Sequence, residues 1–430
     1  MTANRSLGLL QVVAIGIGGM VGGGIFAVLG LAADLGKGGT PVAFLLAGIV
    51  ALVTSYSYAR LSVAFPSAGG TTRFLDEAFG GGLLSGGLNV LLWESYIVMI
   101  ALYAYAFGSY GASYLPAGWS AVGKHALIIA VILLFTGINA LGANIVGEAE
   151  EWIVAFKLAI LALFVLAGLT AIDPSRLAPS TWASPLGLVA GGMIIFVAYE
   201  GFELIANTAK DTRDPERTLP RAYGISVVLV MVLYIAVSAV AVGTLSSSEI
   251  AAAQDYALAA AARPVLGAVG FLLITVAALL STASAINATL YGTARVSYTL
   301  AKDGELPEDL ERRVWDRPVE GLFITSALAL LAASFLDLSS ISVAGSAGFL
   351  FIFLAVNVAC YRLSDRARSS RGIALLGCVL CAAALGILLV EIGLSSPGRL
   401  VVPALLLVAA FGIEGAYRGV RERRRTERRA

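Results

Sequence analysis

The chain has 430 residues, of which 58% are hydrophobic and 13% are charged, with a formal net charge of +1. Soluble domains carry about 25% charged residues, so this composition excludes a soluble globular protein and indicates an integral membrane protein. The single histidine and the three cysteines, Cys360, Cys378 and Cys381, suggest neither a disulfide framework nor a metal site. We therefore expect no metal and no cofactor.

Apolar stretches of about 20 residues, the length that crosses a bilayer as a helix, recur along the chain. The first of them follows a short polar start and lacks a small-residue cleavage site, so we expect it to remain as a helix. The loops are short, which predicts one transmembrane domain over residues 1–417. Twelve all-α spans are predicted near residues 9–34, 40–64, 83–114, 125–142, 150–172, 186–209, 219–243, 266–300, 320–337, 341–361, 373–392 and 399–417.

The first span is unusual because six of the thirteen residues in Ala14–Phe26 are glycine. Glycine costs about 1 kcal/mol relative to alanine inside a helix, so this span is expected to unwind partway. Backbone that unwinds inside a membrane must face protein, water, ions or a ligand rather than lipid. The break is therefore a candidate binding site.

The sixth span carries a glutamate and a glycine, Glu200 and Gly201, within the apolar stretch Phe196–Glu203. Breaks in spans one and six are typical of a five-plus-five inverted repeat with a binding site at the membrane midplane. The repeats would cover about 9–172 and 186–361. Glycines also serve close helix packing in membranes, but packing alone does not explain so many glycines in one span.

Basic residues are distributed unevenly between the predicted loops, and the side richer in them is usually cytoplasmic. With the N-terminus inside, the segment 418–430 forms a basic cytoplasmic tail, and both termini are cytoplasmic. We interpret this tail as an anchor at the lipid surface and not as a nucleic-acid site. The loops on the outer side of the membrane would contain few basic residues, namely Lys37, Lys124, Arg176, Arg263 and Arg399.

Four stretches resemble motifs of the amino acid–polyamine–organocation (APC) superfamily of permeases. They are Gly18–Phe26, Tyr58–Gly80, Tyr199–Arg221 and Ala294–Pro307. The resemblance implies a LeuT-type fold of ten core helices plus two peripheral ones, here about 373–417. It also implies secondary transport of amino acids or related amines by alternating access.

The site that the resemblance implies agrees with the physical properties of the breaks. Helix one resumes near Gly22, Gly23 and Gly24, where free N–H groups and the positive helix end suit a substrate carboxylate. Position 23 is often serine or threonine in relatives and is glycine here, which removes one hydrogen bond to that carboxylate. Carbonyl groups freed at the break around Gly201 would accept hydrogen bonds from the substrate ammonium, together with one in span one. These belong to Ile17, Val197, Ala198 and Glu200.

Lys157 is the only lysine or arginine that we place deep in a predicted span. A charged lysine at the midplane costs about 2.5–3.5 kcal/mol, and burial makes it a plausible proton carrier. In the LeuT-type fold, span five faces spans one and eight, so Lys157 would contact the Gly18 carbonyl and the hydroxyls of Ser281 or Ser284. A subset of prokaryotic, proton-coupled and sodium-independent permeases has lysine at this place. The alternatives are a permanently charged structural residue or a lysine that reaches the membrane surface.

Three glutamates within the spans have open roles. The Glu200 side chain either contacts a basic or amine substrate or leaves recognition to its backbone. Glu203 is expected to line the cytoplasmic half of span six as a gate partner, and the partner of Glu94 is unknown.

We expect a transporter of the plasma membrane that imports amino acids by proton symport and acts as a monomer. Its partners would be an amino-acid substrate, protons and the lipid bilayer. An intramembrane enzyme would need a buried nucleophile and base or a metal cluster, and the sequence offers neither. An amino-acid or amine exchanger and a non-transporting sensor of the same fold remain alternatives, whereas sodium symport is disfavoured because Lys157 would repel the ion.

Overall fold

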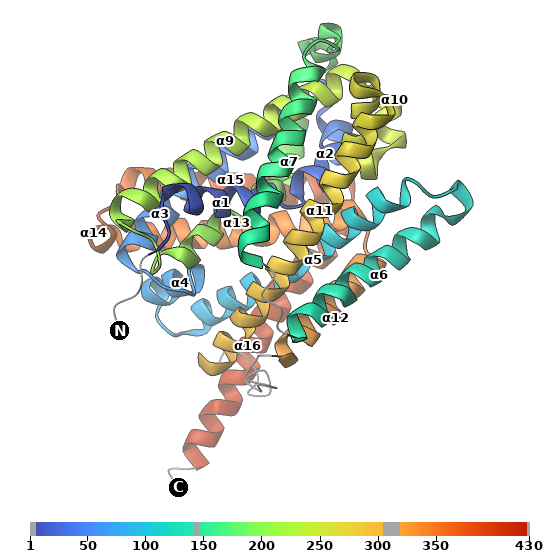
Figure 1. Cartoon of the computed structure of the whole chain (residues 1–430). Helices are drawn as coiled ribbons and strands as arrows, with labels where there is room; N and C mark the ends of the chain where they lie inside the picture. Colours follow the sequence, from blue (N-terminus) through green and yellow to red (C-terminus); the bar gives the residue numbers. More distant parts are fainter. Residues whose placement is uncertain (1–5, 142–145, 304–318, 428–430) are drawn as a thin grey trace.

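The computed structural model is built from helices (Figure 1) and describes residues 6–141, 146–303 and 319–427. Within these ranges, extended pairing is limited to isolated bridges such as Leu7 with Thr212. In the described part of the chain, eight helices are long and apolar enough to cross a membrane, and two bent helix pairs raise the number to ten. Two shorter apolar helices cover Trp152–Gly168 and Glu320–Phe335. This is the composition of a multi-pass membrane protein.

The two bent pairs lie where the sequence predicts breaks. Helix α1 (Leu9–Met20) meets α2 (Gly24–Gly36) at an angle of 47°. Helix α8 (Pro185–Ile194) leads into the 3₁₀ turns η3 (Phe196–Tyr199) and η4 (Phe202–Thr208), with a bend of 50°. Gly201 lies between the two turns, and its φ of +116° is a conformation that favours glycine.

The other helices make up the rest of the bundle. They are α3 (Thr40–Ala64), α4 (Thr71–Phe79), α5 (Leu83–Ala112), α6 (Ala117–Leu141), α7 (Val146–Gly168), α9 (Pro215–Thr244), α10 (Ser247–Ala252), α11 (Ala257–Asp303), α12 (Val319–Phe335), α13 (Leu338–Arg362), α14 (Ser364–Ala367), α15 (Arg371–Ser395) and α16 (Val401–Glu427), with the 3₁₀ turns η1 (Pro174–Leu177), η2 (Pro179–Thr181), η5 (Gln254–Tyr256) and η7 (Pro397–Leu400).

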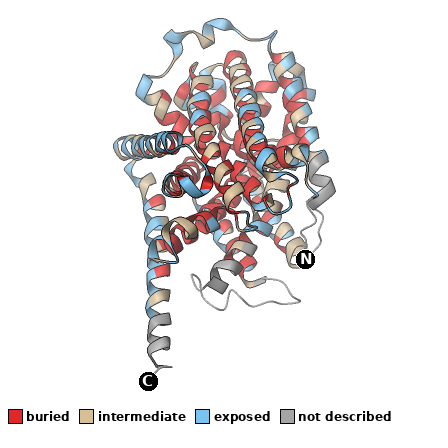
Figure 2. Cartoon of the chain, turned by 90° about the vertical axis from the view of Figure 1, so that its left-hand side faces the viewer, coloured by how far each residue is buried: buried red, intermediate tan, exposed pale blue. Residues whose placement is uncertain are grey.

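Burial separates central from peripheral helices (Figure 2). In α5 and α13, 89% and 83% of the most apolar window is buried, so these helices form the centre of the bundle. The corresponding shares are 28% for α15 and 17% for α16. Helix α15 packs on α3 and α13, and α16 packs on α5. Their exposed apolar faces are suited to lipid.

Several boundaries differ from the predicted ones. Helix α6 begins at Ala117, before the predicted 125, and α11 extends back to Ala257 through a kink at Gly267, whose φ is +65°. Helix α16 continues to Glu427, so most of the segment predicted as a tail prolongs the last helix (Figure 1). Parts of the sequence interpretation fall outside the described residues, namely 304–307 of the motif Ala294–Pro307 and 428–430 of the predicted tail.

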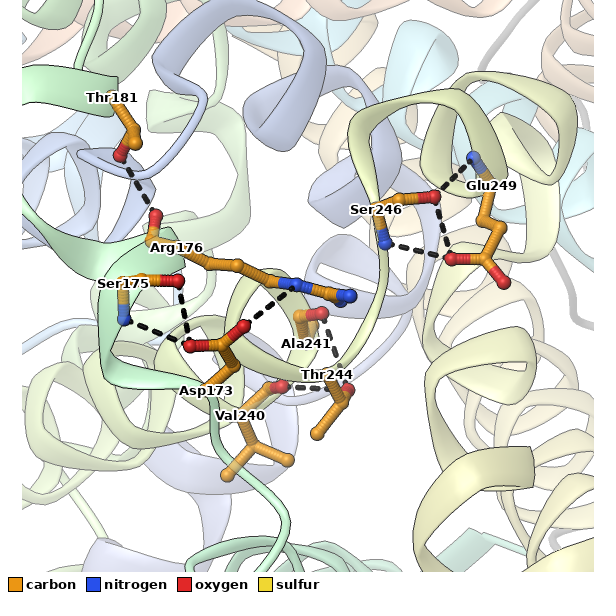
Figure 3. Close-up of polar contacts among 9 residues, drawn as sticks. All are labelled: Asp173, Ser175, Arg176, Thr181, Val240, Ala241, Thr244, Ser246 and Glu249. Atoms are coloured by element: carbon orange, nitrogen blue, oxygen red, sulfur yellow. Dashed lines mark hydrogen bonds and ion pairs between the residues drawn. The ribbon is translucent and has the colours of Figure 1, made fainter.

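Polar contacts stabilise two loops, one after the C-terminal end of α7 and one after the C-terminal end of α9 (Figure 3). Asp173 accepts hydrogen bonds from the hydroxyl and the N–H of Ser175, at 2.7 and 3.0 Å, and these bonds lower the pKa of its carboxyl group. Glu249 accepts the hydroxyl and N–H of Ser246 at 2.6 and 2.7 Å, which lowers its pKa in the same way. Arg176 contributes a smaller attraction to both carboxylates. The capping carboxyl groups of Asp173 and Glu249 are therefore ionised at neutral pH.

Candidate functional site

The two breaks touch each other through glycine backbone. A Cβ atom added to Gly19 would lie 2.7 Å from the Gly201 carbonyl oxygen. A Cβ added to Gly201 would be driven into the Gly19 carbonyl carbon and the Met20 nitrogen. Side chains at these positions would therefore separate the broken helices, because real Cβ atoms do not approach other atoms so closely.

Tyr234 of α9 clamps the two breaks together. Its hydroxyl oxygen lies 2.7 Å from the Met20 carbonyl oxygen and 3.1 Å from the Ala198 carbonyl oxygen, and it donates toward both. Met20 ends α1 and Ala198 lies in η3. One phenol thus partners carbonyl groups that the two breaks free from helical hydrogen bonds.

We predict that Tyr234→Phe lowers the free energy of unfolding by about 1–2 kcal/mol, since two buried carbonyl groups lose a donor while the ring remains. Thermal unfolding of the purified protein, followed by intrinsic fluorescence, should shift down by a few degrees. Tyr361→Phe is the matched control because Tyr361 is 43% exposed, and its unfolding temperature should match that of the wild type. An equal shift in both variants would contradict the clamp.

The N-terminus of α2 offers backbone N–H groups to a ligand. No side chain caps this helix, so its first N–H groups have no partner within the helix. A Cβ at Gly24 would lie 2.7 Å from Ala198 Cα, and a Cβ at Gly23 would overlap the Tyr103 ring. Glycine at both positions lets η3 and Tyr103 approach the helix end.

Three of the four carbonyl groups predicted to receive an ammonium already accept hydrogen bonds within the protein. The Ile17 carbonyl accepts the Val21 N–H at 2.8 Å, and the Val197 carbonyl accepts the Glu200 N–H at 3.2 Å. The Ala198 carbonyl accepts the Tyr234 hydroxyl. Because a carbonyl oxygen has two lone pairs, each can accept one further bond from a ligand.

Lys157 lies in the interior of the bundle, with 2% of the residue exposed. Its Nζ donates a hydrogen bond of 3.1 Å to the Gly18 carbonyl oxygen of α1. Ser281 of α11 donates to the carbonyl oxygens of Val21, at 2.7 Å, and Gly22. The lysine thus binds backbone at the end of α1 and this serine binds backbone within the first break, while Ser284 lines a cavity nearby.

A pair of buried glutamates lies at the second break. The carboxyl groups of Glu200 and Glu203 interact with each other. Tyr103 donates to Glu200 Oε2 at 3.1 Å, and Glu203 accepts the Gly201 N–H at 2.8 Å and the Tyr96 hydroxyl at 3.4 Å. Glu200 and Glu203 are 4% and 1% exposed. By contrast, Glu94 Oε2 is buried without a hydrogen-bond partner and does not line the cavity beside Glu200.

Two cavities lie on opposite sides of the double break. The first, which we call the Glu200 cavity, has a volume of about 120 Å³ and is lined by α1, α5, α11 and η4 together with Glu200; its lining includes Ile15, Gly18, Leu204 and Asn207. The second, the Asp255 cavity, has a volume of about 410 Å³ and is lined by the other halves of the broken helices, α2 and α8, with η5, α13 and α15. The breaks therefore separate two spaces.

The structure brings together the predicted residues of α1, α2, η3 and α7, but the Glu200 cavity reaches only some of them. Gly18, Glu200 and Ser284 line it, whereas its lining does not include Gly22, Gly23, Gly24, Val197 or Ala198. Sequence reasoning missed Tyr96, Tyr103 and Tyr234. Tyrosines in apolar helices carry no signal that separates a polar bridge from ordinary packing.

Comparison with known proteins agrees with this architecture. A family model for amino acid permeases matches residues 7–411. An uncharacterized protein of Methanocaldococcus jannaschii, MJ0609, is 40% identical over 84% of this chain and 83% of its own length. The inner membrane transport protein YbaT of Escherichia coli is 37% identical over 87% of each chain. The branched-chain amino acid permease BcaP of Lactococcus lactis is 27% identical over 84% of this chain and 83% of its own.

These matches extend over nearly all of the bundle and include both broken helices. The family description and the names of these relatives indicate transport and not enzymatic chemistry. The chain belongs to the amino acid permease family of the APC superfamily of membrane transporters.

Proposed function

We propose that this transporter imports amino acids by proton symport through alternating access. The observation that carries the proposal is the double break at Gly19 and Gly201, with an uncapped helix end, carbonyl groups that can each accept a further hydrogen bond, and a buried lysine around it. A discontinuous helix pair of this kind is how many secondary transporters hold their substrates.

The substrate carboxylate would bind at the first N–H groups of α2, at Gly22, Gly23 and Gly24, where the helix dipole is favourable. The ammonium would bind carbonyl groups of α1 and η3. The ammonium-binding part of the site would consist of Ile17, Val197, Ala198, Glu200 and Gly201. Backbone atoms would thus recognise the α-amino acid, and side chains around them would choose its side chain.

Lys157 would carry the coupled proton. As an ammonium it donates to the Gly18 carbonyl and holds α1 in place; as a neutral amine it would hold that carbonyl more weakly. Ser281 and Ser284 would support the same region of α1 and α11. Proton binding and the position of the first break would therefore be linked, which symport requires.

The eight long helices, two bent pairs and two shorter apolar helices support a count of twelve spans. We propose that they form LeuT-type repeats over about 9–172 and 186–361, followed by two peripheral helices. We further propose a monomer in the plasma membrane with both termini in the cytoplasm. The Glu200 cavity would then open toward the cytoplasm and the Asp255 cavity toward the outside.

The names of relatives do not agree on a substrate. BcaP is named for branched-chain amino acids, and other relatives are named for methylthioribose and for cationic amino acids. An amino-acid exchanger of the same fold is the second candidate, because nothing in the site requires net import.

The test is uptake of radiolabelled amino acids into sodium-free proteoliposomes with an inward proton gradient. We expect accumulation into liposomes that hold no internal amino acid. Uptake only when the liposomes are preloaded with substrate would favour an exchanger. Binding without any uptake would favour a sensor, and a requirement for sodium would contradict proton symport.

A further inference from the structure

A third cavity, which we call the Arg176 cavity, lies at the end of the bundle where α7 and α9 finish. It has a volume of about 260 Å³ and shares no lining residue with the two cavities beside the double break. Two basic residues, Lys37 and Arg176, belong to its wall, and no described residue of the wall is acidic. The wall also has a hydroxyl side and an apolar side, formed by Thr181, Ser246 and Ser247 and by Val242, Leu245 and Ile250.

One end of the Arg176 guanidinium group lacks a partner among the described residues. Its Nε lies 3.7 Å from Asp173 Oδ2, whereas its Nη1 is buried and has no hydrogen-bond partner. Figure 3 shows the side chain extending from its own loop toward the loop that carries Ser246. A guanidinium group has five N–H donors in a fixed fork, and buried polar groups are nearly always hydrogen-bonded. The unpartnered end of the fork therefore indicates an acceptor from outside the chain.

Lys37 supplies a second positive charge to the same wall. Its φ of +51° is uncommon for a residue with a side chain. A Cβ atom on the next residue, Gly38, would collide with the Thr181 hydroxyl oxygen and the Arg176 carbonyl oxygen. The backbone around Lys37 therefore packs tightly against the loop that carries Arg176. The Lys37 side chain is exposed and forms no ion pair with a residue that the structure describes.

Two carboxylates lie close to this wall, and each already has other donors. Asp173 accepts hydrogen bonds from Ser175, and Glu249 accepts hydrogen bonds from Ser246. Arg176 attracts both carboxylates, so a ligand anion must bind strongly enough to overcome their repulsion. This requirement favours an anion with several acceptor oxygens over a simple monovalent ion.

A phosphate group meets this requirement. Its oxygens match the planar fork of an arginine, with which phosphates often form two parallel hydrogen bonds. The Lys37 ammonium and the Ser247 hydroxyl would supply further donors from the same wall. The phosphate could come from a phospholipid headgroup or from free inorganic phosphate.

The position of the cavity favours the lipid headgroup. Arg176 belongs to the loop that follows the C-terminal end of α7. Leu166 and Leu169, at that end, are 67% and 59% exposed, which suits contact with acyl chains. Basic residues at a membrane surface attract anionic lipids. A lipid could therefore place its phosphate at the polar side of the cavity and its chains beside the exposed leucines.

We propose that the Arg176 cavity binds the phosphate group of an anionic phospholipid between the Arg176 guanidinium and the Lys37 ammonium. The bound lipid would join the end of α2 to the loops after α7 and α9, which supply the two sides of the wall. The proposal depends neither on the substrate nor on the coupling ion.

The test is native mass spectrometry of the full chain, purified in detergent, delipidated and titrated with phosphatidylglycerol or with phosphatidylcholine of the same acyl chains. We expect the wild type to bind its first phosphatidylglycerol more tightly than its first phosphatidylcholine. The double substitution Lys37→Gln with Arg176→Gln should weaken that phosphatidylglycerol about 10- to 100-fold, the range for one charged hydrogen bond. Lys37→Gln alone changes an exposed side chain and should give part of this loss even if the double variant does not fold.

Arg263→Gln is the matched control, because Arg263 is predicted on the same side of the membrane and lines none of the three cavities. It should bind phosphatidylglycerol as the wild type does. A parallel ³¹P NMR titration with inorganic phosphate distinguishes the two sources. Binding of inorganic phosphate that the double variant loses, with unchanged phosphatidylglycerol binding, would overturn the lipid as ligand. Equal binding of both ligands by the wild type and the double variant would overturn the site itself.

Discussion

Gly201→Ala is expected to reduce uptake to the background of protein-free liposomes. The φ of Gly201 is +116°, and an alanine in the left-handed region costs about 1–2 kcal/mol. The added Cβ would also meet the backbone of Gly19 and Met20, and such overpacking typically costs about 1–3 kcal/mol more. The breaks would separate, and the Tyr234 hydroxyl could no longer reach both of its carbonyl partners.

The measurement combines uptake with size-exclusion chromatography, which separates loss of function from loss of folding. Gly224→Ala is the control, because Gly224 lies within α9 and a Cβ there meets nothing within 4 Å. That variant should fold and transport normally, or gain slight stability from the higher helix propensity of alanine. Gly19→Ala provides a second test from the opposite helix. Normal uptake by both Gly19→Ala and Gly201→Ala would show that close contact between the breaks is unnecessary.

Lys157→Ala is expected to abolish accumulation driven by a proton gradient while substrate binding persists. The substitution removes the Nζ that donates to the Gly18 carbonyl and the group proposed to carry the proton. Uptake should then proceed only until inside and outside concentrations are equal. Substrate-dependent thermal stabilisation should remain, because the backbone groups at Gly23, Gly24 and Ala198 are unchanged.

Lys157→Arg separates proton transfer from structure. Arginine keeps a positive charge near the Gly18 carbonyl but does not release its proton at physiological pH. If Lys157 carries the proton, the arginine variant should fold and still fail to accumulate substrate. Restoration of proton-driven accumulation by arginine would identify Lys157 as a structural cation.

Much of the fold could be predicted because hydrophobicity and glycine content report directly on membrane helices and their breaks. The thirteen residues of Ala14–Phe26 pointed to a bend between α1 and α2, and the Glu-Gly of the sixth span pointed to the bend before η4. Helix ends were less predictable. Helix α6 begins at Ala117 and α16 continues to Glu427, because apolar composition marks where a helix is buried in lipid and not where its hydrogen bonds stop.

Contacts around the breaks were predictable where backbone conformation or charge made a residue exceptional. Lys157 is a cation in an apolar span, and it does lie against the Gly18 carbonyl. Tyr234 and Tyr103 were not predictable, because their roles depend on which carbonyl or carboxyl group the tertiary fold brings to their hydroxyls. The same holds for the glutamate pair: Glu200 and Glu203 lie three positions apart, but only the 3₁₀ geometry around Gly201 shows that their carboxyl groups meet.

The most direct test of proton symport is the internal pH of liposomes during substrate entry. Proteoliposomes loaded with pyranine, with equal pH on both sides and the membrane potential clamped by potassium and valinomycin, receive external substrate. The account predicts acidification inside wild-type liposomes that follows substrate uptake in time and is absent with Lys157→Ala. Substrate entry with no change in internal pH would contradict it.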